Sequence, residues 1–131
     1  METPQLPRAL ERPRTHDLEA TVNACLDYAL AHPETVTILV FGVPLTSHGI
    51  ICAMVDAVTA RGMVADFHFA RQVLILPNGA RVHWGHINAP EYWRGLRADA
   101  VYLHSGASAQ VRQVLEICHL LHAGERHWVE W

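Results

Sequence analysis

The chain has 131 residues, of which 50% are hydrophobic and 18% are charged, so its composition is that of one folded globular domain rather than a disordered chain. The net charge is −3 at pH 7 with histidine neutral, which argues against broad non-specific binding to nucleic acid, because such binding needs many cationic phosphate contacts. We find no signal peptide and no apolar run long enough to cross a bilayer, and therefore expect a cytoplasmic protein without membrane contact.

The first half of the chain begins with a proline-rich stretch and then becomes periodic. Residues 1–14 are expected to form a loosely attached arm, and residues 15–131 a single domain. An amphipathic helix is predicted from residue 15 or 17 to about residue 31, where a proline follows. Residues 36–41 (VTILVF) are continuously apolar and rich in β-branched side chains, which predicts a buried strand.

A second helix is predicted over about residues 46–61, with Gly62 at its C-terminal cap. Residues 63–69 alternate between apolar and polar side chains, as in a half-exposed strand near a sheet edge. The triplet Pro77-Asn78-Gly79 then favours a tight turn, because Asn and Gly tolerate positive φ angles. We therefore expect a β-hairpin over about residues 72–86.

The apolar stretch ADAVYL (98–103) predicts another buried parallel strand, followed by a helix over about 108–122 and a last strand within 125–131. The strand stops at His104 and Ser105. Ligand sites of open α/β sheets lie just past the carboxyl ends of such strands, so these two residues are where a chemical site is expected. No nucleophile-elbow glycine pattern precedes Ser105, which disfavours hydrolase chemistry.

The alternation of strands and helices predicts an α/β fold, namely a three-layer sandwich with a mostly parallel sheet and one β-hairpin. An exposed edge strand such as ERHWVEW at residues 125–131 would allow two copies to pair into a homodimer. The cysteines Cys25, Cys52 and Cys118 have no CxxC spacing and lie in predicted helices. We expect them to be buried free thiols in a reducing compartment.

Two blocks of the sequence resemble the ATPase domain of tailed-phage large terminases. The first, residues 18–55, contains a helix end YALAHP that is similar to the family's "yAl.hP" signature and leads into an apolar strand and a helix. The second, residues 76–105, is similar to the family's stretch from a Pro-Asn-Gly turn through "rGlraD" to the Walker B acid pair. The resemblance implies a P-loop-NTPase-like core and a phage or prophage protein in the host cytoplasm.

The aligned phosphate loop departs from that family. A phosphate loop needs glycines, a lysine and a Ser or Thr, but residues 10–15 (LERPRT) contain no glycine. Pro13 has no N–H to donate, and Arg14 and Thr15 stand in the Lys-Thr positions, where a planar guanidinium replaces a point charge. A competing register over residues 42–49 puts His48 in the lysine position and fails equally, and the strand that should precede the loop is missing.

The Walker B pair is also replaced. The family's Asp and Glu align with His104 and Ser105, and neither side chain is a carboxylate that could hold Mg²⁺ or polarise water. The resemblance therefore implies a core that lacks an intact phosphate loop. We expect no ATP hydrolysis, no catalytic residue and no cofactor.

Other side chains offer weaker candidates. Arg14, Thr15, Arg94 and Arg97 could supply anion or nucleotide contacts, although a solvated loop is favoured for the last two. Histidines are the candidate metal ligands, namely His83, His86, His104, His119 and His122. No cysteine or carboxylate completes a four-ligand site at a familiar spacing, so surface or capping roles are favoured and no metal is expected.

Three functions follow from these features. The leading hypothesis is a non-catalytic, terminase-ATPase-like accessory module that binds a protein, either a host factor or a phage packaging component. The second is a subunit that binds nucleotide or nucleic acid without turnover. The third is a small metalloprotein with histidine ligands.

Overall fold

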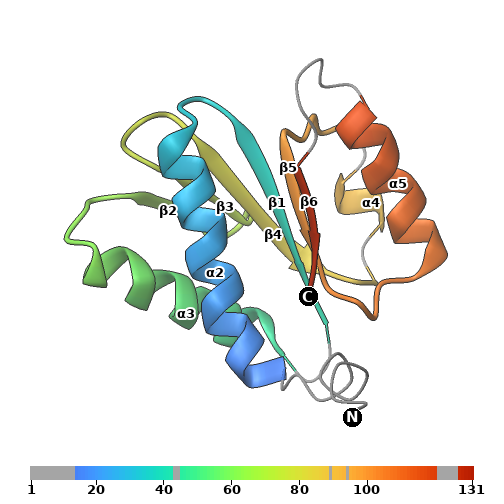
Figure 1. Ribbon diagram of the computed structural model, residues 1–131, viewed down its shortest axis with the longest axis horizontal. Coiled ribbons are helices and arrows are strands. Elements are labelled where there is room, and N and C mark those ends of the chain that lie inside the picture. The colour runs from blue at the N-terminus through green and yellow to red at the C-terminus, as the bar shows by residue number, and fades with distance from the viewer. Residues whose placement is uncertain (1–13, 43–44, 89, 94, 121–126) are drawn as a thin grey trace, which may run out of the picture.

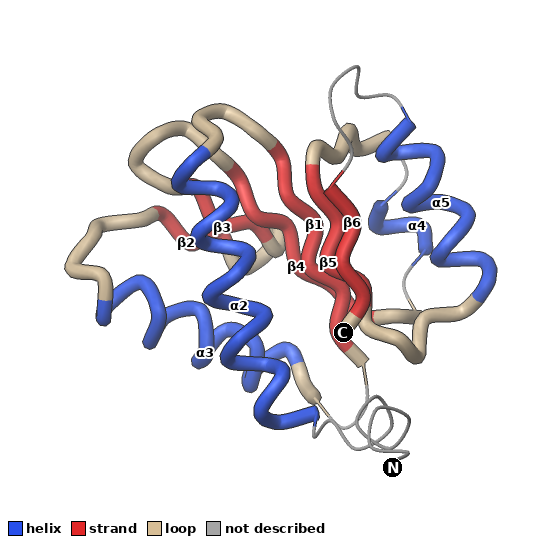
Figure 2. Tube along the Cα trace, viewed as in Figure 1, coloured by secondary structure: helices blue, strands red, loops and turns tan. Residues whose placement is uncertain are grey.

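A mixed sheet in the order β2-β3-β4-β1-β5-β6 forms the middle of the molecule (Figures 1 and 2). The structure is a computed structural model, which describes residues 14–42, 45–88, 90–93, 95–120 and 127–131. The strands are β1 Val36–Phe41, β2 Asp66–His68, β3 Val73–Ile75, β4 Arg81–His86, β5 Ala100–Leu103 and β6 His127–Glu130. Strands β4, β1, β5 and β6 are mutually parallel, whereas β2 and β3 run antiparallel to their neighbours. The fold is therefore α/β with a mostly parallel sheet, as predicted. Strands β2, β3 and β4 form two consecutive antiparallel hairpins, of which only the β3–β4 hairpin was predicted.

Helices cover both faces of this sheet. Helices α2 (Arg14–Ala31) and α3 (Ser47–Ala60) lie on one face, and α4 (Pro90–Trp93) and α5 (Ala109–Leu120) lie on the other (Figure 1). We call these the α2/α3 face and the α4/α5 face. The arrangement gives three layers, with one apolar core on each side of the sheet.

The two central strands show why continuous apolar runs form here. In β1, Leu39 and Phe41 pack into the core of the α2/α3 face, while Ile38 and Val40 pack into the core of the α4/α5 face. Strand β5 alternates in the same way and all four of its residues are buried. Because both faces of a central strand are covered, nearly all of its side chains are apolar; Thr37 of β1 is a polar exception and is fully buried as well.

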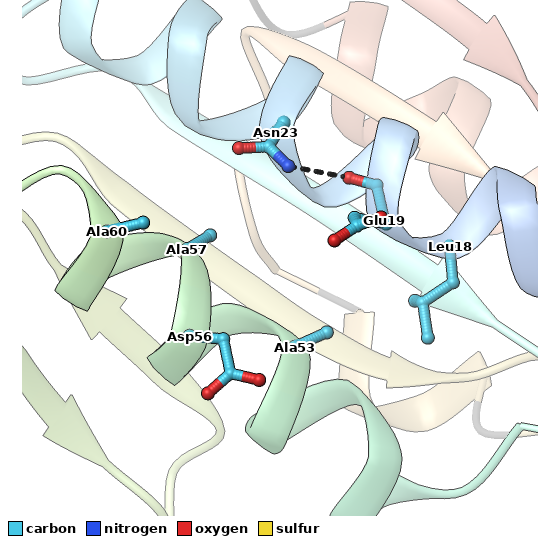
Figure 3. A pocket seen from close by; sticks show the side chains of 7 residues that line it. All are labelled: Leu18, Glu19, Asn23, Ala53, Asp56, Ala57 and Ala60. Carbon is cyan, nitrogen blue, oxygen red and sulfur yellow. Dashed lines mark hydrogen bonds between the residues drawn. The ribbon is translucent and has the colours of Figure 1, made fainter.

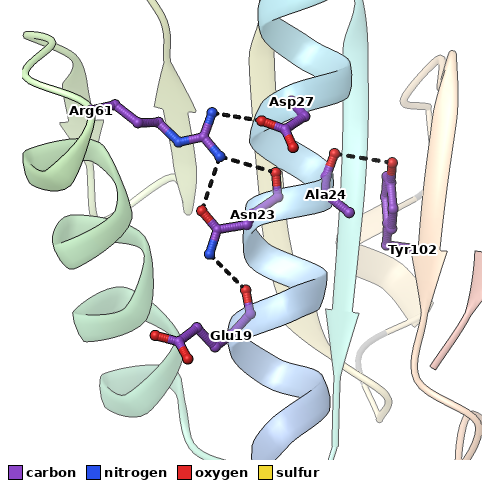
Figure 4. Close-up of polar contacts among 6 residues, drawn as sticks. All are labelled: Glu19, Asn23, Ala24, Asp27, Arg61 and Tyr102. Carbon is purple, nitrogen blue, oxygen red and sulfur yellow. Dashed lines mark hydrogen bonds and ion pairs between the residues drawn. The ribbon is translucent and has the colours of Figure 1, made fainter.

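The ends of α3 are fixed by local chemistry. Thr46 is its N-cap, and the hydroxyl of Thr46 accepts the N–H of Gly49 at 3.0 Å. Gly62 follows the helix with φ +67°, the left-handed conformation that ends helices at glycine. Arg61 reaches across to α2, where its guanidinium donates to the Asp27 carboxylate at 2.8 Å and to the side-chain oxygen of Asn23 at 2.9 Å (Figure 4).

The structure corrects several details of the sequence interpretation. The strand predicted over 63–69 is limited to the three residues of β2, and Phe69, which the alternation placed on the apolar face, is 56% exposed instead of facing the core. The short helix α4 was not predicted; it brings Trp93 into the core of the α4/α5 face. Cys25 and Cys118 are buried free thiols as predicted, but Cys52 is exposed on α3.

Some predictions fall wholly or partly outside the described residues. Helix α2 begins at Arg14, which was assigned to the arm, and residues 1–13 of that arm are not described. The same holds for residues 121–126, between α5 and β6. The division into an arm and one domain stays a prediction. None of the described helices is long and apolar enough to span a membrane.

Candidate functional site

The parallel strands all end at one edge of the sheet, which we call the carboxyl edge. Gly42, Ile87, His104 and Trp131 directly follow β1, β4, β5 and β6 there. Ligands of open α/β sheets bind at this edge, so it is the candidate site. The structure places His104 and Ser105 at the end of β5, which is where the sequence predicted them.

His104 fills the space behind the end of β1. Its side chain is buried, and its Nδ1 accepts the N–H of Gly106 at 3.0 Å. The ring meets Trp131 edge to face, with ring centres 5.2 Å apart and an angle of 81° between the planes. A Cβ atom at Gly42 would lie only 3.0 Å from Nδ1 of His104, so the glycine leaves room for the imidazole. This histidine is packed as a core residue at the carboxyl edge.

Ser105 points the other way and is exposed, so the two side chains diverge as expected for neighbours at a strand end. Arg112 on α5 holds this segment. Its guanidinium donates to the Ser105 carbonyl at 3.2 Å, to the Ala107 carbonyl at 3.3 Å and to the Glu130 carboxylate at 2.8 Å. The sequence interpretation missed Arg112, because its three partners lie up to 18 residues away and share no motif with it.

The first turns of α2 and α3 both start on the carboxyl-edge side of the sheet (Figure 1). The backbone places Arg14 and Thr15 in the first turn of α2, and His48 in the first turn of α3. Helix N-termini carry partial positive charge, so this edge has a favourable backbone field for anions. The side chains of Arg14 and Thr15 lie outside the described residues.

The remaining arginine candidates do not join this edge. Arg97 is exposed and precedes β5 by three residues, so it lies towards the amino end of that strand, opposite His104. Arg94 lies outside the described residues. The structure therefore does not bring Arg97 together with the first turn of α2 into one anion site.

The candidate histidine ligands of β4, His83 and His86, lie on opposite faces of the sheet. His83 faces Tyr92, and burial, with a smaller contribution from the charge of Arg81, lowers the pKa of His83 to about 4. His86 packs edge to face on Phe41 with ring centres 5.4 Å apart, and its Nδ1 accepts the N–H of Asn88 at 3.1 Å. These two imidazoles cannot share a metal ion.

His119 is buried on α5, where its Nε2 lies 3.2 Å from the Asp99 carbonyl and 3.3 Å from the amide nitrogen of His127. It therefore ties α5 to the amino ends of β5 and β6, far from His104 along both strands. Its predicted companion His122 is outside the described residues. In the part of the chain that the structure describes, no three His, Cys, Asp or Glu residues gather as a metal site would require.

The thiols differ in their environment. Burial raises the pKa of the Cys25 and Cys118 thiols, so both stay protonated at neutral pH. The Cys118 thiol also donates to the Trp93 carbonyl at 3.1 Å, which fixes α5 against α4. The exposed Cys52 lies 3.5 Å from Nε2 of His48, one turn earlier on α3.

A groove of about 450 Å³ runs between α2 and α3, and Figure 3 shows the alanine side chains of α3 facing α2 across it. Its lining residues are Leu18, Glu19, Asn23, Ala53, Asp56, Ala57 and Ala60. The carboxylates of Glu19 and Asp56 are exposed, and the Asn23 amide is already bonded to Arg61 and to the Glu19 carbonyl (Figure 4). These side chains do not form an arrangement with an evident chemical role.

Sequence comparison finds no relative, whereas structural comparison does. No known family model matches the chain, and no curated protein is similar to it in sequence. Among solved structures, the chain is similar to the large terminase of a thermophilic bacteriophage, with a TM-score of 0.68 and 12% sequence identity. The match covers 89% of this chain and 31% of the terminase chain, so this chain spans less than a third of that protein. At this identity the similarity shows a terminase-like fold.

Proposed function

We propose that this protein is a phage or prophage module that keeps the fold of a terminase ATPase core, has lost its nucleotide chemistry, and acts by binding a protein partner. The partner would be a host factor or a component of phage DNA packaging. The fold supports the origin, because β1, α3, the hairpin and β5 follow one another as in the resembling blocks and the terminase structure is similar over most of this chain.

The observation that carries the loss of chemistry is the environment of His104. At the end of β5 a terminase-like ATPase needs carboxylate oxygens that hold Mg²⁺ and polarise the attacking water. Here an imidazole occupies that position, buried against Trp131 and with Nδ1 committed to the Gly106 N–H. Next to it stands an exposed serine hydroxyl. The glycine-free segment before α2 supports the same conclusion.

The support for partner binding is apolar surface around β2. Val64 and Phe69 flank this edge strand and are 85% and 56% exposed, and Phe69 stacks on Phe67 with ring centres 5.7 Å apart. Exposed apolar side chains beside an unpaired strand edge are typical of a surface that another protein covers. We call Val64, Phe69 and β2 the β2 patch.

The catalytic half of the proposal is tested by phosphate release from Mg²⁺–ATP. We expect no release above a protein-free blank for the wild type, and no change in His104→Ala or Arg14→Ala. Turnover by pure wild-type protein that disappears in either variant would contradict the proposal. A thermal-shift series with nucleotides and short DNA at low salt tests the second hypothesis; a stabilisation that Arg14→Ala removes would replace our proposal with binding without turnover.

The binding half is tested by capture from host lysate with three baits. We expect the wild type and Ile117→Ser to retain the same protein, and a Val64→Ser/Phe69→Ser variant to lose it. Ile117 is the matched control, because it is 61% exposed but lies on α5, on the other side of the sheet. Equal capture by all three baits would show that the β2 patch is not the binding surface.

A further inference from the structure

The outer edge of β6 presents unpaired backbone groups. The Trp131 N–H donates to the Leu103 carbonyl at 3.0 Å and the Trp131 carbonyl accepts the Ser105 N–H at 2.8 Å, so the backbone of Trp131 faces β5. Because these directions alternate along a strand, Val129 also faces β5, whereas the N–H and C=O groups of Trp128 and Glu130 face outward. In the described part of the chain no strand lies beyond β6.

A groove runs along this edge on the α2/α3 face. It has a volume of about 240 Å³ and is lined by Ala20, Thr21, Ala24, Tyr102, Val129, Glu130 and Trp131. The Tyr102 hydroxyl donates to the Ala24 carbonyl at 3.3 Å and so fixes α2 above β5 (Figure 4). Since α2 offers small side chains here, an added strand could place a branched apolar side chain beneath the helix.

The edge lacks the usual protection against strand pairing. Edge strands are commonly guarded by proline, lysine or a bulge, and the sequence HWVE of β6 contains neither proline nor lysine. Its one carboxylate, on Glu130, is paired with Arg112 at 2.8 Å and lies 3.4 Å from the Trp128 indole nitrogen. The charge that could repel a second strand is therefore held by partners within the same chain.

We propose that this edge binds a second copy of the chain, with the two β6 strands antiparallel about a two-fold axis at Val129. In this register Trp128 lies opposite Glu130 of the second copy, so both outward-facing residues of each strand pair and four backbone hydrogen bonds form. The two Val129 side chains meet on the α2/α3 face, beside the groove. A register centred on Glu130 would instead oppose two carboxylates, which is unfavourable.

This interface is independent of whether the protein has lost catalysis, and it lies at the opposite end of the sheet from the β2 patch. The same isologous surface is used on both copies, so the pairing closes as a dimer and does not propagate. The two sheets would join into one continuous sheet across the axis.

The first test compares Glu130→Pro with Glu130→Ala by sedimentation at a series of concentrations. Both variants lose the Arg112 ion pair, but only proline removes the outward N–H, and an edge strand tolerates proline there because that N–H makes no internal bond. We expect dimers for the wild type and Glu130→Ala at tens of micromolar, and a dissociation constant at least about tenfold higher for Glu130→Pro. A monomeric wild type, or equal association of the two variants, would overturn the proposal.

The second test locates the axis. In a Cys52→Ser background, Val129→Cys places two thiols opposite each other in a non-hydrogen-bonded pair, where the Cα–Cα separation of about 4.5 Å is within the range of a disulfide. We expect mild oxidation to give a covalent dimer with Val129→Cys and none with Gln113→Cys, an exposed position on α5. Crosslinking through Asp66→Cys on β2 in place of Val129→Cys would show that the copies meet at the wrong edge.

Discussion

Gly85 shows how a single residue without a side chain can fix a tertiary contact. It lies within β4, where it pairs with Val40 of β1, and the strand runs through it without a break. A Cβ atom at this position would lie 2.6 Å from Cζ2 and 2.7 Å from Cη2 of Trp93. The glycine therefore admits the indole to the sheet surface, a role that the sequence alone does not reveal.

Gly85→Ala is expected to lower the free energy of unfolding by roughly 1–3 kcal/mol, because Trp93 is fully buried and must shift. Chemical denaturation measures the change. Gly49→Ala is the matched control: its Cβ would meet Thr46 at 3.5 Å, an ordinary contact, and alanine within a helix is neutral or stabilising by up to about 1 kcal/mol. Adding Trp93→Phe to Gly85→Ala should recover part of the loss. Equal effects of the two glycine substitutions would contradict this explanation.

His83 should make stability depend on pH. Burial, and secondly the charge of Arg81, lower its pKa to about 4 in the folded protein, while the unfolded chain titrates near the ordinary value of 6.5. Between those values the unfolded chain binds a proton that the folded protein does not. The contribution of His83 is therefore fully present above pH 6.5 and is lost as the pH falls towards 4, by about 3 kcal/mol.

This prediction is measured as the difference between wild type and His83→Gln, which cancels the titration of the other nine histidines. We expect the wild type to lose stability more steeply than the variant between pH 6.5 and 4, and the two slopes to agree above pH 7. Parallel curves over the whole range would show that the folded protein binds the proton on His83 as readily as the unfolded chain.

The candidate site shows where residue-level prediction from sequence ends. The position of His104 and Ser105 was predictable, because a continuous apolar run locates β5 and ligand sites of α/β sheets lie at the carboxyl ends of such strands. The packing of His104 on Trp131 and the three contacts of Arg112 were not, because they join segments that only the sheet order brings together. Local pattern carries no information on such pairs.

At the scale of elements, the two stretches that carry the terminase resemblance touch each other. The side-chain amide of Asn78, in the turn between β3 and β4, donates to the carbonyls of Ala29 and Leu30 at 2.9 and 3.2 Å, at the end of α2. Its side-chain oxygen accepts the Ala80 N–H at 3.0 Å, and Gly79 has φ +85°. The turn thus closes the hairpin and caps the helix at once, so one side chain links the two stretches.

Asn78→Asp should destabilise the protein at pH 7 by roughly 2–3 kcal/mol, and by more than Asn78→Ala does. Aspartate keeps the acceptor for Ala80 but loses both donors and puts a negative charge beside the carbonyl end of α2, where the helix dipole is unfavourable to it. Thermal or urea unfolding measures which of the two variants is less stable. The difference in unfolding free energy between Asn78→Asp and Asn78→Ala should become smaller below pH 4, because the carboxylate is then protonated. If Asn78→Ala were the less stable variant at pH 7, the capping role would be contradicted.

A helix or strand was predictable where its own residues show the full hydrophobic pattern of that element. The other elements were not predictable. Strand β1 matches the predicted range residue for residue, since both its faces are buried. Strand β2 is shorter than its alternation suggested, because Phe69 finds no core to face. Helix α4 was missed because four residues are too few for a helical period to show.

At the scale of the whole molecule, the sheet order assigns different stability to its strands. Strand β1 lies between β4 and β5, and both helix layers cover it, whereas β2 and β6 are the outermost strands of the described sheet. The sequence predicted the mostly parallel sheet and the hairpin, but not this order, since the order depends on which strands each connection crosses. The order determines which strands other chains can reach.

Amide hydrogen exchange, measured over a range of protein concentrations, tests this arrangement as a whole. We expect the amides of β1 to exchange slowest and those of β2 fast, because opening the centre of the sheet requires global unfolding while its edge opens locally. The amides of Trp128 and Glu130 should exchange fast in dilute protein and more slowly as concentration rises, because the proposed pairing with a second copy would cover them. Val129 is the internal control, because its N–H faces β5 and should be protected at every concentration. Exchange at Trp128 and Glu130 that is independent of concentration, whether fast or slow, would mean that no second copy binds at β6.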